Sequence, residues 1–203
     1  MRFSHLTSDR YLRQPWKNGG GSTLEIARGE LEGRMLWRMS IATVAASGPF
    51  SDFSGYRRTI MLLAGAGVVL RFEDAPDQRI DRPHVPFDFD GGRAVQGDLI
   101  DGPAEDFNLM VDSARATGTL AVLDLGAAPL TVTLNHDVAL VFVLSGAVQI
   151  DASGQRFDLA ERETLRIDHH GPILTGVTLS LAAGGAAGQV ALIGIDRVQH
   201  AGA

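Results

Sequence analysis

The chain has 203 residues, of which 45% are hydrophobic, and its formal net charge is −6. This length allows one large or two compact domains, and the apolar content is enough for a sizeable core. The acidic balance argues against nucleic acid as a partner, because binding a phosphate backbone needs a broad basic face. The sequence has no cysteine, which excludes disulfides, thiol catalysis and thiolate metal sites.

The beginning of the chain lacks the apolar segment of a signal peptide, and no apolar run approaches the length of a membrane span. The lack of cysteine is compatible with a reducing compartment. We therefore expect a cytoplasmic protein that has no membrane partner.

Short apolar segments alternate with turn residues along most of the chain. Residues 7–14 predict a short helical turn that Pro15 ends, and residues 160–166 have a weak helical alternative. The other segments recur every ~8–14 residues, which is typical of an all-β sandwich or barrel. We expect strands at 22–28, 35–44, 58–64, 67–73, 85–89, 93–99, 107–112, 119–125, 130–134, 138–145, 147–151, 173–181 and 189–197.

The chain also contains a faint internal repeat. An apolar strand, an Ala-Gly or Ser-Gly turn and a second apolar strand occur at 58–72 and again at 138–150. Two duplicated β-barrel modules of ordinary domain size would explain the repeat. The alternative is that apolar hairpins look alike in any all-β protein. We place the first module at residues 1–115 and the second at 116–203.

Residues 15–23 form the most distinctive local motif, in which three consecutive glycines permit positive φ angles and a close approach of another group. Lys17, within this motif, is the only lysine of the chain. An ammonium and a guanidinium are not interchangeable at a specific site, so Lys17 and its neighbour Asn18 are candidate ligand contacts. An ordinary surface turn is the alternative.

Several motifs, in order along the chain, resemble the HutD/Ves family of small bacterial bicupins. Arg57 stands where the family usually has aspartate, which changes the charge beside Arg58. Ser54 stands where the family usually has proline, which changes the stiffness of the turn. The second half of the chain resembles the family mainly in architecture. The matching motifs are Pro-Trp-Lys-Asn-Gly-Gly-Gly at 15–21, Trp-Arg-Met-Ser-Ile-Ala at 37–42, Gly-Pro-Phe-Ser-Asp-Phe at 48–53, the apolar hairpin at 58–67, Phe-Asp-Gly at 89–91 and Asp-Phe-Asn-Leu-Met at 106–110.

This resemblance implies an all-β bicupin, with two jelly-roll barrels in one cytoplasmic chain, which in some bacteria is linked to histidine utilisation. A ligand similar to N-formylglutamate has been proposed for the family, and no reaction is established for it. Dimerisation through an edge strand is frequent among cupins and stays open for this chain.

The metal-binding pattern of catalytic cupins, two histidines and a glutamate followed by a later histidine, is not found in the sequence. When the pattern is anchored on Gly65, Arg58 stands in place of the glutamate, and the later motif places Asn108 at the last histidine. Anchored on Gly146 in the second module, the pattern places Ala139 at the glutamate. We therefore expect no metal or other cofactor, unless scattered histidines meet only in the fold. The first two histidine positions hold Ser51 and Phe53 or, with the shorter spacing, Asp52 and Ser54.

The polar residues that remain suggest a different kind of site. Side chains two residues apart in a strand share a face, so Arg38 and Ser40 lie together opposite the apolar residues between them. Arginine binds a carboxylate through a planar fork and lysine as a point charge, and small ligands commonly bind in the mouths of β-barrels. Asp106 would orient one of the arginines. We predict a barrel mouth or lumen that binds a small carboxylate and is lined by Lys17, Asn18, Arg38, Ser40, Arg58 and Asn108.

The alternative to a binding site is a set of structural ion pairs, Arg38 with Asp106 or Arg58 with Glu25. Two function classes stay open at the level of the sequence. One is a metal-free binder that senses a metabolite in a regulatory role. The other is a metal-independent cupin enzyme, an isomerase or hydrolase, with Glu25 or Lys17 as the proton carrier. The chain has no Gly-x-Ser-x-Gly, phosphate-loop or His-Glu-x-x-His motif, which favours the binder.

Overall fold

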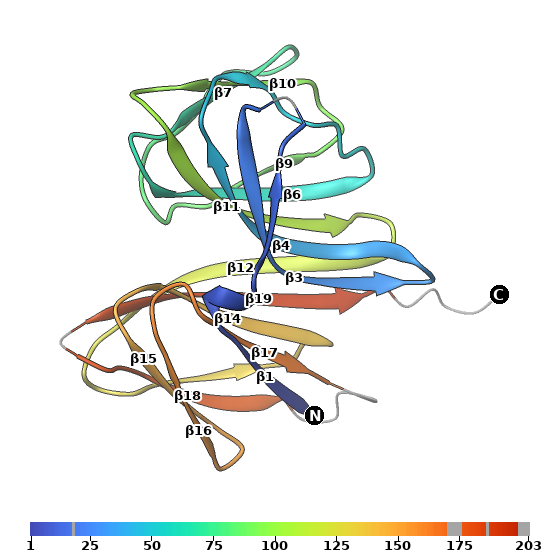
Figure 1. Ribbon diagram of the computed structural model, residues 1–203. Coiled ribbons are helices and arrows are strands. Elements are labelled where there is room, and N and C mark those ends of the chain that lie inside the picture. The colour runs from blue at the N-terminus through green and yellow to red at the C-terminus, as the bar shows by residue number, and fades with distance from the viewer. Residues whose placement is uncertain (18, 170–175, 186, 199–203) are drawn as a thin grey trace. The chain divides into compact units, whose positions relative to one another are not determined.

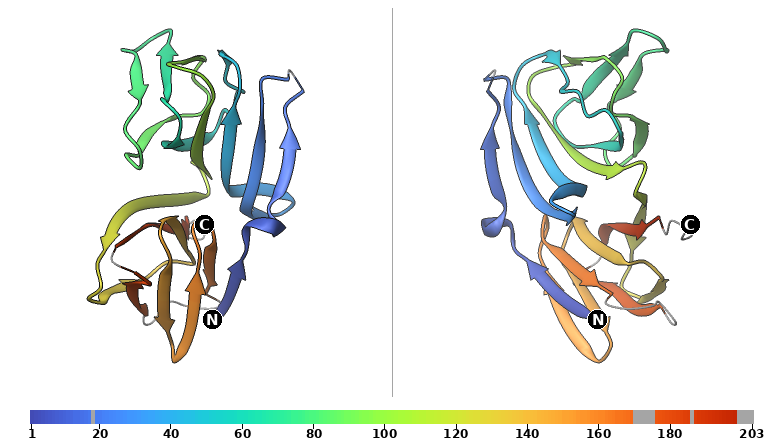
Figure 2. Two further views of the ribbon diagram at one scale, coloured as in Figure 1. Left: turned by 60° about the vertical axis from the view of Figure 1, so that its left-hand side comes forward. Right: turned by 90° about the vertical axis from the view of Figure 1, so that its right-hand side faces the viewer.

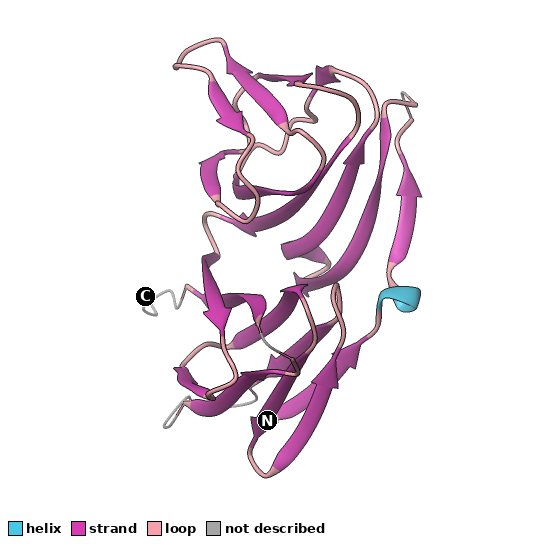
Figure 3. Cartoon of the chain, turned by 90° about the vertical axis from the view of Figure 1, so that its left-hand side faces the viewer, coloured by secondary structure: helices cyan, strands magenta, loops and turns pink. Residues whose placement is uncertain are grey.

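The protein is built almost entirely from short β-strands, as the computed structural model shows (Figure 1). The structure describes residues 1–17, 19–169, 176–185 and 187–198. Within these ranges the helical content is a single 3₁₀ turn, η1 (Ser8–Arg10), which is cyan in Figure 3. No helix in the described ranges has the length and apolarity needed to cross a membrane. The chain divides into two compact units, residues 11–116 and residues 1–10 together with 117–203.

The unit formed by residues 11–116 consists of two antiparallel sheets, whose strands run from blue to green in Figure 2. The six-stranded sheet has the order β2 (Leu12–Pro15), β3 (Gly21–Leu31), β4 (Arg34–Val44), β11 (Ala104–Asp112), β6 (Tyr56–Ala64) and β9 (Phe87–Asp90). The four-stranded sheet has the order β5 (Gly48–Pro49), β10 (Val95–Leu99), β7 (Val68–Phe72) and β8 (Gln78–Ile80). One apolar cluster joins them, with Ile60, Leu62 and Phe89 from the first sheet and Val68, Leu70, Phe72, Ile80 and Val95 from the second.

The register of the central strands aligns the polar residues of the six-stranded sheet. On β11, Asn108 pairs with Ser40 of β4, and Met110 lies between Arg38 of β4 and Arg58 of β6. Because residues directly opposite each other in adjacent strands point to the same face, all of these side chains share a face. It is the face that carries Ile60 and Leu62, so the polar residues continue the inner, core-facing side of this sheet.

The second unit has the same plan of two antiparallel sheets but an aliphatic interior. Its five-stranded sheet has the order β1 (Arg2–Leu6), β17 (Thr164–Asp168), β14 (Val138–Ser145), β19 (Gly188–Arg197) and β12 (Ala116–Leu125), and its four-stranded sheet the order β13 (Leu130–Leu134), β18 (Val177–Ala183), β15 (Val148–Ala152) and β16 (Gln155–Leu159). Valine, leucine and isoleucine dominate its core. Among its described residues, Thr164 is the single buried polar side chain. The other buried polar side chains of the described residues lie in the unit formed by residues 11–116.

The structure differs from the expected elements at several places. The first ten residues belong with the second unit, because β1 pairs with β17 from Arg2 opposite Asp168 to Leu6 opposite Thr164. The helical alternative at 160–166 is wrong, since β17 begins at Thr164. The expected helical turn at 7–14 is limited to η1, after which β2 begins at Leu12. These segments are too short for their periodicity to distinguish a strand from a turn.

Candidate functional site

Four polar side chains are almost completely buried on the inner face of the six-stranded sheet. Arg58 is 5% exposed, Asn108 3%, and Asp106 and Ser40 each 2%. Arg38 lies at the margin of this group and is half-buried. Buried charges are rare in proteins unless they are paired, so this polar cluster, which we define as Arg38, Ser40, Arg58, Asp106 and Asn108, calls for a physical explanation.

The amide of Asn108 lies between the buried cation and the buried carboxyl group. Arg58 Nη2 donates a hydrogen bond of 2.8 Å to Asn108 Oδ1, and Asn108 Nδ2 donates to Asp106 Oδ1. Two buried atoms at the ends of this chain, Arg58 Nε and Asp106 Oδ2, have no hydrogen-bond partner among the described residues, and the same holds for Arg38 Nε. Each such atom loses its hydration without compensation, at a cost of about 1–3 kcal/mol. The cluster therefore has hydrogen-bonding capacity that the protein itself does not use.

Aromatic rings surround the two guanidinium groups. The Cζ atom of Arg58 lies 4.9 Å from the ring centroid of Phe89, 5.2 Å from that of Phe50 and 5.6 Å from that of Phe53. Arg38 Cζ lies 5.3 Å from the same Phe53 ring. Such contacts stabilise a cation through the ring quadrupole, and they leave the in-plane N–H donors available. Phe53 thus lies against both arginines of the cluster.

Burial changes the pKa values of all three ionisable groups in the cluster. It lowers the pKa of Arg58 to about 10, against the opposing effect of the Asp106 charge, so this guanidinium stays protonated at neutral pH. Burial likewise lowers the pKa of Arg38, and the charge of Glu25 opposes the shift. Burial raises the pKa of Asp106 to about 7, although the Arg58 charge and the Asn108 hydrogen bond act in the other direction. At neutral pH the cluster therefore carries more positive than negative charge.

The segment of residues 50–55, between β5 and β6, covers the cluster. Its backbone is held at two points, by Phe50 N to Val95 O at 2.8 Å and by Phe53 N to Gly91 O at 2.9 Å. The Phe50 ring fits against Gly97 of β10, where an added Cβ would come within 2.5 Å of the ring. Two further bonds, from Ser54 N and Oγ to Asp52 Oδ1, stiffen the turn at the position where the family pattern has proline.

Two hollows on the protein surface lie beside this segment, with volumes of ≈ 520 and ≈ 460 Å³. Phe50 lines the second, and Glu73, Gly92 and Arg93 line both. Neither is lined by a member of the polar cluster. Arg38 is the half-buried member of the cluster, and Ser40, Arg58, Asp106 and Asn108 are buried.

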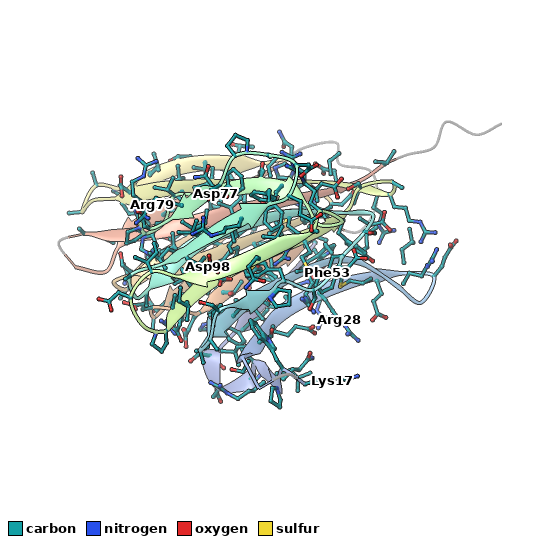
Figure 4. The ribbon with its side chains drawn as sticks, turned by 90° about the horizontal axis from the view of Figure 1, so that it is seen from above. Lys17, Arg28, Phe53, Asp77, Arg79 and Asp98 are labelled. Carbon is teal, nitrogen blue, oxygen red and sulfur yellow. The ribbon has the colours of Figure 1, made fainter. Side chains whose placement is uncertain are left out.

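The structure brings together four of the six residues that we predicted from the sequence, Arg38, Ser40, Arg58 and Asn108. Asn18 lies outside the described residues. Lys17 is exposed, and its side chain points away from the strands in Figure 4. The glycine motif turns the chain from β2 into β3, which begins at Gly21. Gly21 pairs with Val44 of β4. Val44 lies six residues along β4 from Arg38, a distance of about 20 Å at ~3.3 Å per residue.

The glycine motif has a clear structural role. Trp16 Nε1 donates a hydrogen bond of 2.9 Å to Thr23 Oγ1. The Trp16 ring packs against Gly21, where an added Cβ would lie 3.0 Å from the ring. Gly19 has a φ of 71°, in the region that favours glycine. These contacts explain the tryptophan and the glycines without a ligand, and they leave Lys17 as a solvent-facing turn residue.

Neither ion pair that we considered from the sequence is present among the described residues. Glu25 lies on β3, opposite Ser40 of β4, and forms an ion pair of 3.7 Å with Arg28. Arg58 donates a hydrogen bond to Asn108. The sequence prediction gave Asp106 only an orienting role and did not include Phe50 or Phe53. Both phenylalanines belong to the motif at residues 48–53, which could have indicated aromatic residues near the site.

The donor set does not fit the metal site of catalytic cupins. Arg58 stands at the glutamate position of the metal-binding pattern and Asn108 at its last histidine position, and both are buried in the unit formed by residues 11–116. Within the described ranges, no three or more histidine, aspartate or glutamate side chains come together as metal ligands would. We derive no chemistry through a metal for this site.

Solved structures with little sequence similarity define the class of fold. A cupin 2 conserved barrel domain protein from Leptotrichia buccalis aligns with a TM-score of 0.59 at 10% identity, over 86% of this chain and 88% of that one. The Ylba protein from E. coli aligns with a TM-score of 0.66 at 8% identity, over 95% of this chain and 90% of that one. The protein therefore has an all-β, cupin-like fold, as the family resemblance predicted.

More similar relatives identify the family. The HutD family profile matches residues 8–187, and a Pseudomonas putida protein described as "uncharacterized 21.2 kDa protein in hutC 3'region" is 36% identical over 83% of this chain and 88% of its own length. HutD from Pseudomonas fluorescens SBW25, solved in a formate condition, aligns with a TM-score of 0.82 at 32% identity, over 98% of this chain and all of that one. Protein Ves from Citrobacter koseri is 36% identical over 66% of this chain and 69% of its own length. The chain belongs to the HutD family, and the predicted resemblance is confirmed.

Proposed function

We propose that the unit formed by residues 11–116 binds a small carboxylate metabolite of histidine catabolism, similar to N-formylglutamate, in its interior and without a metal, and that this binding serves a regulatory or sensing role. The observation that carries the proposal is the polar cluster, in which the buried Nε atoms of Arg58 and of the half-buried Arg38 have no hydrogen-bond partner among the described residues. The histidine-utilisation context comes from the relatives, one of which is encoded beside hutC and another of which is named HutD.

The geometry of the cluster suits an anion with a planar, two-oxygen group. Each arginine offers a fork of parallel N–H donors, and bidentate pairing of this kind is among the strongest hydrogen-bonded arrangements in proteins. Arg38 and Arg58 both lie opposite Met110, on strands that flank β11, so their side chains extend over the same part of the sheet. Two like charges held close together in a low-dielectric interior repel each other, and a bound carboxylate removes that repulsion.

A thermal-shift screen tests this function. The compounds are formate, N-formyl-L-glutamate, urocanate, L-histidine, L-glutamate and formiminoglutamate, each with and without EDTA. A ligand at about 100 times its Kd adds about 2.7 kcal/mol of stability, which is roughly 5–10 °C for a protein of this size. We expect such a shift with one carboxylate, unchanged by EDTA.

Adjacent arginines provide a matched pair of variants. Arg58→Met removes the buried cation, while Arg57→Met removes an exposed one that pairs with Asp88 on the outer face. We expect the ligand-induced shift to vanish in Arg58→Met and to persist in Arg57→Met and in Lys17→Met. A shift that survives Arg58→Met and Arg38→Met would contradict the proposed site. Turnover of a compound that is lost in Glu25→Gln would instead favour the metal-independent enzyme.

A further inference from the structure

We propose that the polar cluster binds its carboxylate ligand together with a proton, which Asp106 takes up from solvent at Oδ2. This inference rests on the proposed function and concerns how the same site responds to pH. It starts from a feature that carboxylate binding alone does not explain, namely an acidic side chain at the end of the hydrogen-bond chain that contains the cation.

Asp106 has the geometry of a group that alternates between two protonation states. Asp106 is 2% exposed, and among the described residues its carboxyl accepts one hydrogen bond, at Oδ1 from Asn108 Nδ2. Oδ2 is buried and has no partner among the described residues, so it has room to carry a proton without breaking an existing bond. No ion pair joins Asp106 to Arg58 within the described part of the chain, because the Asn108 amide lies between them.

The charged groups around Asp106 make its ionisation sensitive to a second anion. Arg58 on β6 is the main cation that stabilises its carboxylate, and Glu105, the preceding residue on β11, opposes ionisation. Arg38 on β4 stands two strands from Arg58, and Glu25 and Arg28 on β3 act on Arg38. Among the described residues nearby, Asp52, Asp88 and Asp90 are exposed, and the half-buried Arg93, over the Phe72 ring, pairs with Asp74. The facing sheet contributes uncharged residues, namely Val68, Leu70, Phe72, Ile80, Val95 and Gly97.

A ligand carboxylate at the arginines therefore competes with Asp106 for the same positive field. Two carboxylates that share a desolvated site do not both stay ionised, and the one that is less well hydrogen-bonded takes a proton. Asp106 has one hydrogen bond, whereas the ligand gains the forks of two arginines. Binding thus raises the proton affinity of Asp106, and by linkage the ligand binds more tightly as the pH falls.

Isothermal titration calorimetry with N-formyl-L-glutamate at pH 6, 7 and 8 tests the inference. Both carboxyl groups of this probe ionise well below pH 6, so changes in this range belong to the protein. In the wild-type protein we expect the Kd to rise about tenfold from pH 6 to pH 8, which is the linkage result for a group that titrates near 7 in the free protein and stays protonated in the complex. Titrations in buffers of different ionisation enthalpy should show uptake that approaches one proton per ligand at pH 8.

Two variants isolate the source of the proton effect. Asp106→Asn imitates the protonated carboxyl, and we expect tight binding with the same Kd at all three pH values and no proton uptake. Glu105→Gln removes a neighbouring acid that opposes the ionisation of Asp106, so it should keep a pH dependence of at least tenfold. Wild-type binding that is independent of pH and exchanges no proton would overturn this inference and leave the proposed function intact. The absence of binding to the wild-type protein at every pH would overturn both.

Discussion

Asn108 determines how the charges of the polar cluster interact. A direct ion pair between Arg58 and Asp106 would neutralise both groups and leave nothing for a ligand. With the amide between them, Arg58 Nε has no hydrogen-bond partner among the described residues. The charge of Arg58 and the Asn108 hydrogen bond stabilise the Asp106 carboxylate too weakly to offset the desolvation cost of its burial. Buried polar groups of this kind are commonly a liability for stability, and a bound carboxylate, as proposed, would offset that cost.

The raised pKa of Asp106 predicts how stability depends on pH without any ligand. The folded protein holds this proton up to about pH 7, whereas the unfolded chain releases it near the ordinary aspartate pKa. Between these values the folded state binds more protons, so Asp106 makes the free energy of unfolding decrease as the pH rises, by at most about 1.4 kcal/mol per pH unit. We expect Asp106→Asn to remove this contribution and to be more stable than the wild type at pH 8. Urea unfolding at pH 5, 6, 7 and 8 measures the difference, and a variant whose stability runs parallel to the wild type would contradict the assignment.

At the scale of elements, the segment of residues 50–55 lies against the arginines of the cluster. It contributes the Phe50 and Phe53 rings that lie against the guanidinium groups, and its backbone is fixed to Val95 and Gly91. Its position depends on Gly97, since the Phe50 ring occupies the space of the missing side chain. Gly97, on β10, thus leaves the space that lets the Phe50 ring lie against Arg58.

The cross-strand pair Gly97 and Gly48 offers a direct test of that packing. An added methyl at Gly97 would meet Phe50 at 2.5 Å, whereas nothing lies within 4 Å of the same position on Gly48. We expect Gly97→Ala to cost about 1–3 kcal/mol through overpacking and Gly48→Ala to change stability little. Chemical denaturation of both variants measures this difference. Equal stability of the two would show that Phe50 does not depend on the space at Gly97.

At the scale of the whole molecule, the chain forms two units that differ in their interiors. The unit formed by residues 11–116 contains the polar cluster, while the other has an aliphatic core to which residues 1–10 contribute β1. Phe3 of β1 packs against this core, with its ring centroid 5.6 Å from that of Phe157. The first residues of the chain therefore complete the second unit.

Substitution of Phe3 should weaken the second unit at a definite place. We expect Phe3→Ala to lower its stability by about 1–3 kcal/mol, less than the loss for a fully buried phenylalanine. Hydrogen exchange of β17, the strand that pairs with β1, should accelerate. Leu12→Ala on β2 removes a side chain that is 59% exposed and serves as the control. Unchanged exchange in β17 would mean that β1 contributes little to this sheet.

The sequence predicted those parts of the fold and site that depend on local patterns. Alternation in residues 35–44 placed Arg38 and Ser40 on one strand face, and register then brought Asn108 beside them. The position of Lys17 could not be predicted, because it depends on which end of β4 the β2–β3 turn reaches. The interposed amide and the aromatic cover also escaped prediction, since hydrogen-bond geometry between β6 and β11 and the path of a loop follow from tertiary packing.

The most direct test of the central claim is to observe the guanidinium groups themselves. We would record the side-chain Nε–H NMR signals of arginine while N-formyl-L-glutamate is added, and assign the Arg58, Arg38 and Arg57 signals by single Arg→Lys variants. The proposed site predicts that the Arg58 and Arg38 signals move downfield as their free Nε–H groups gain a carboxylate partner, while the Arg57 signal stays in place. Unchanged Arg58 and Arg38 signals at a concentration that saturates the thermal shift would contradict the binding of the carboxylate by the polar cluster.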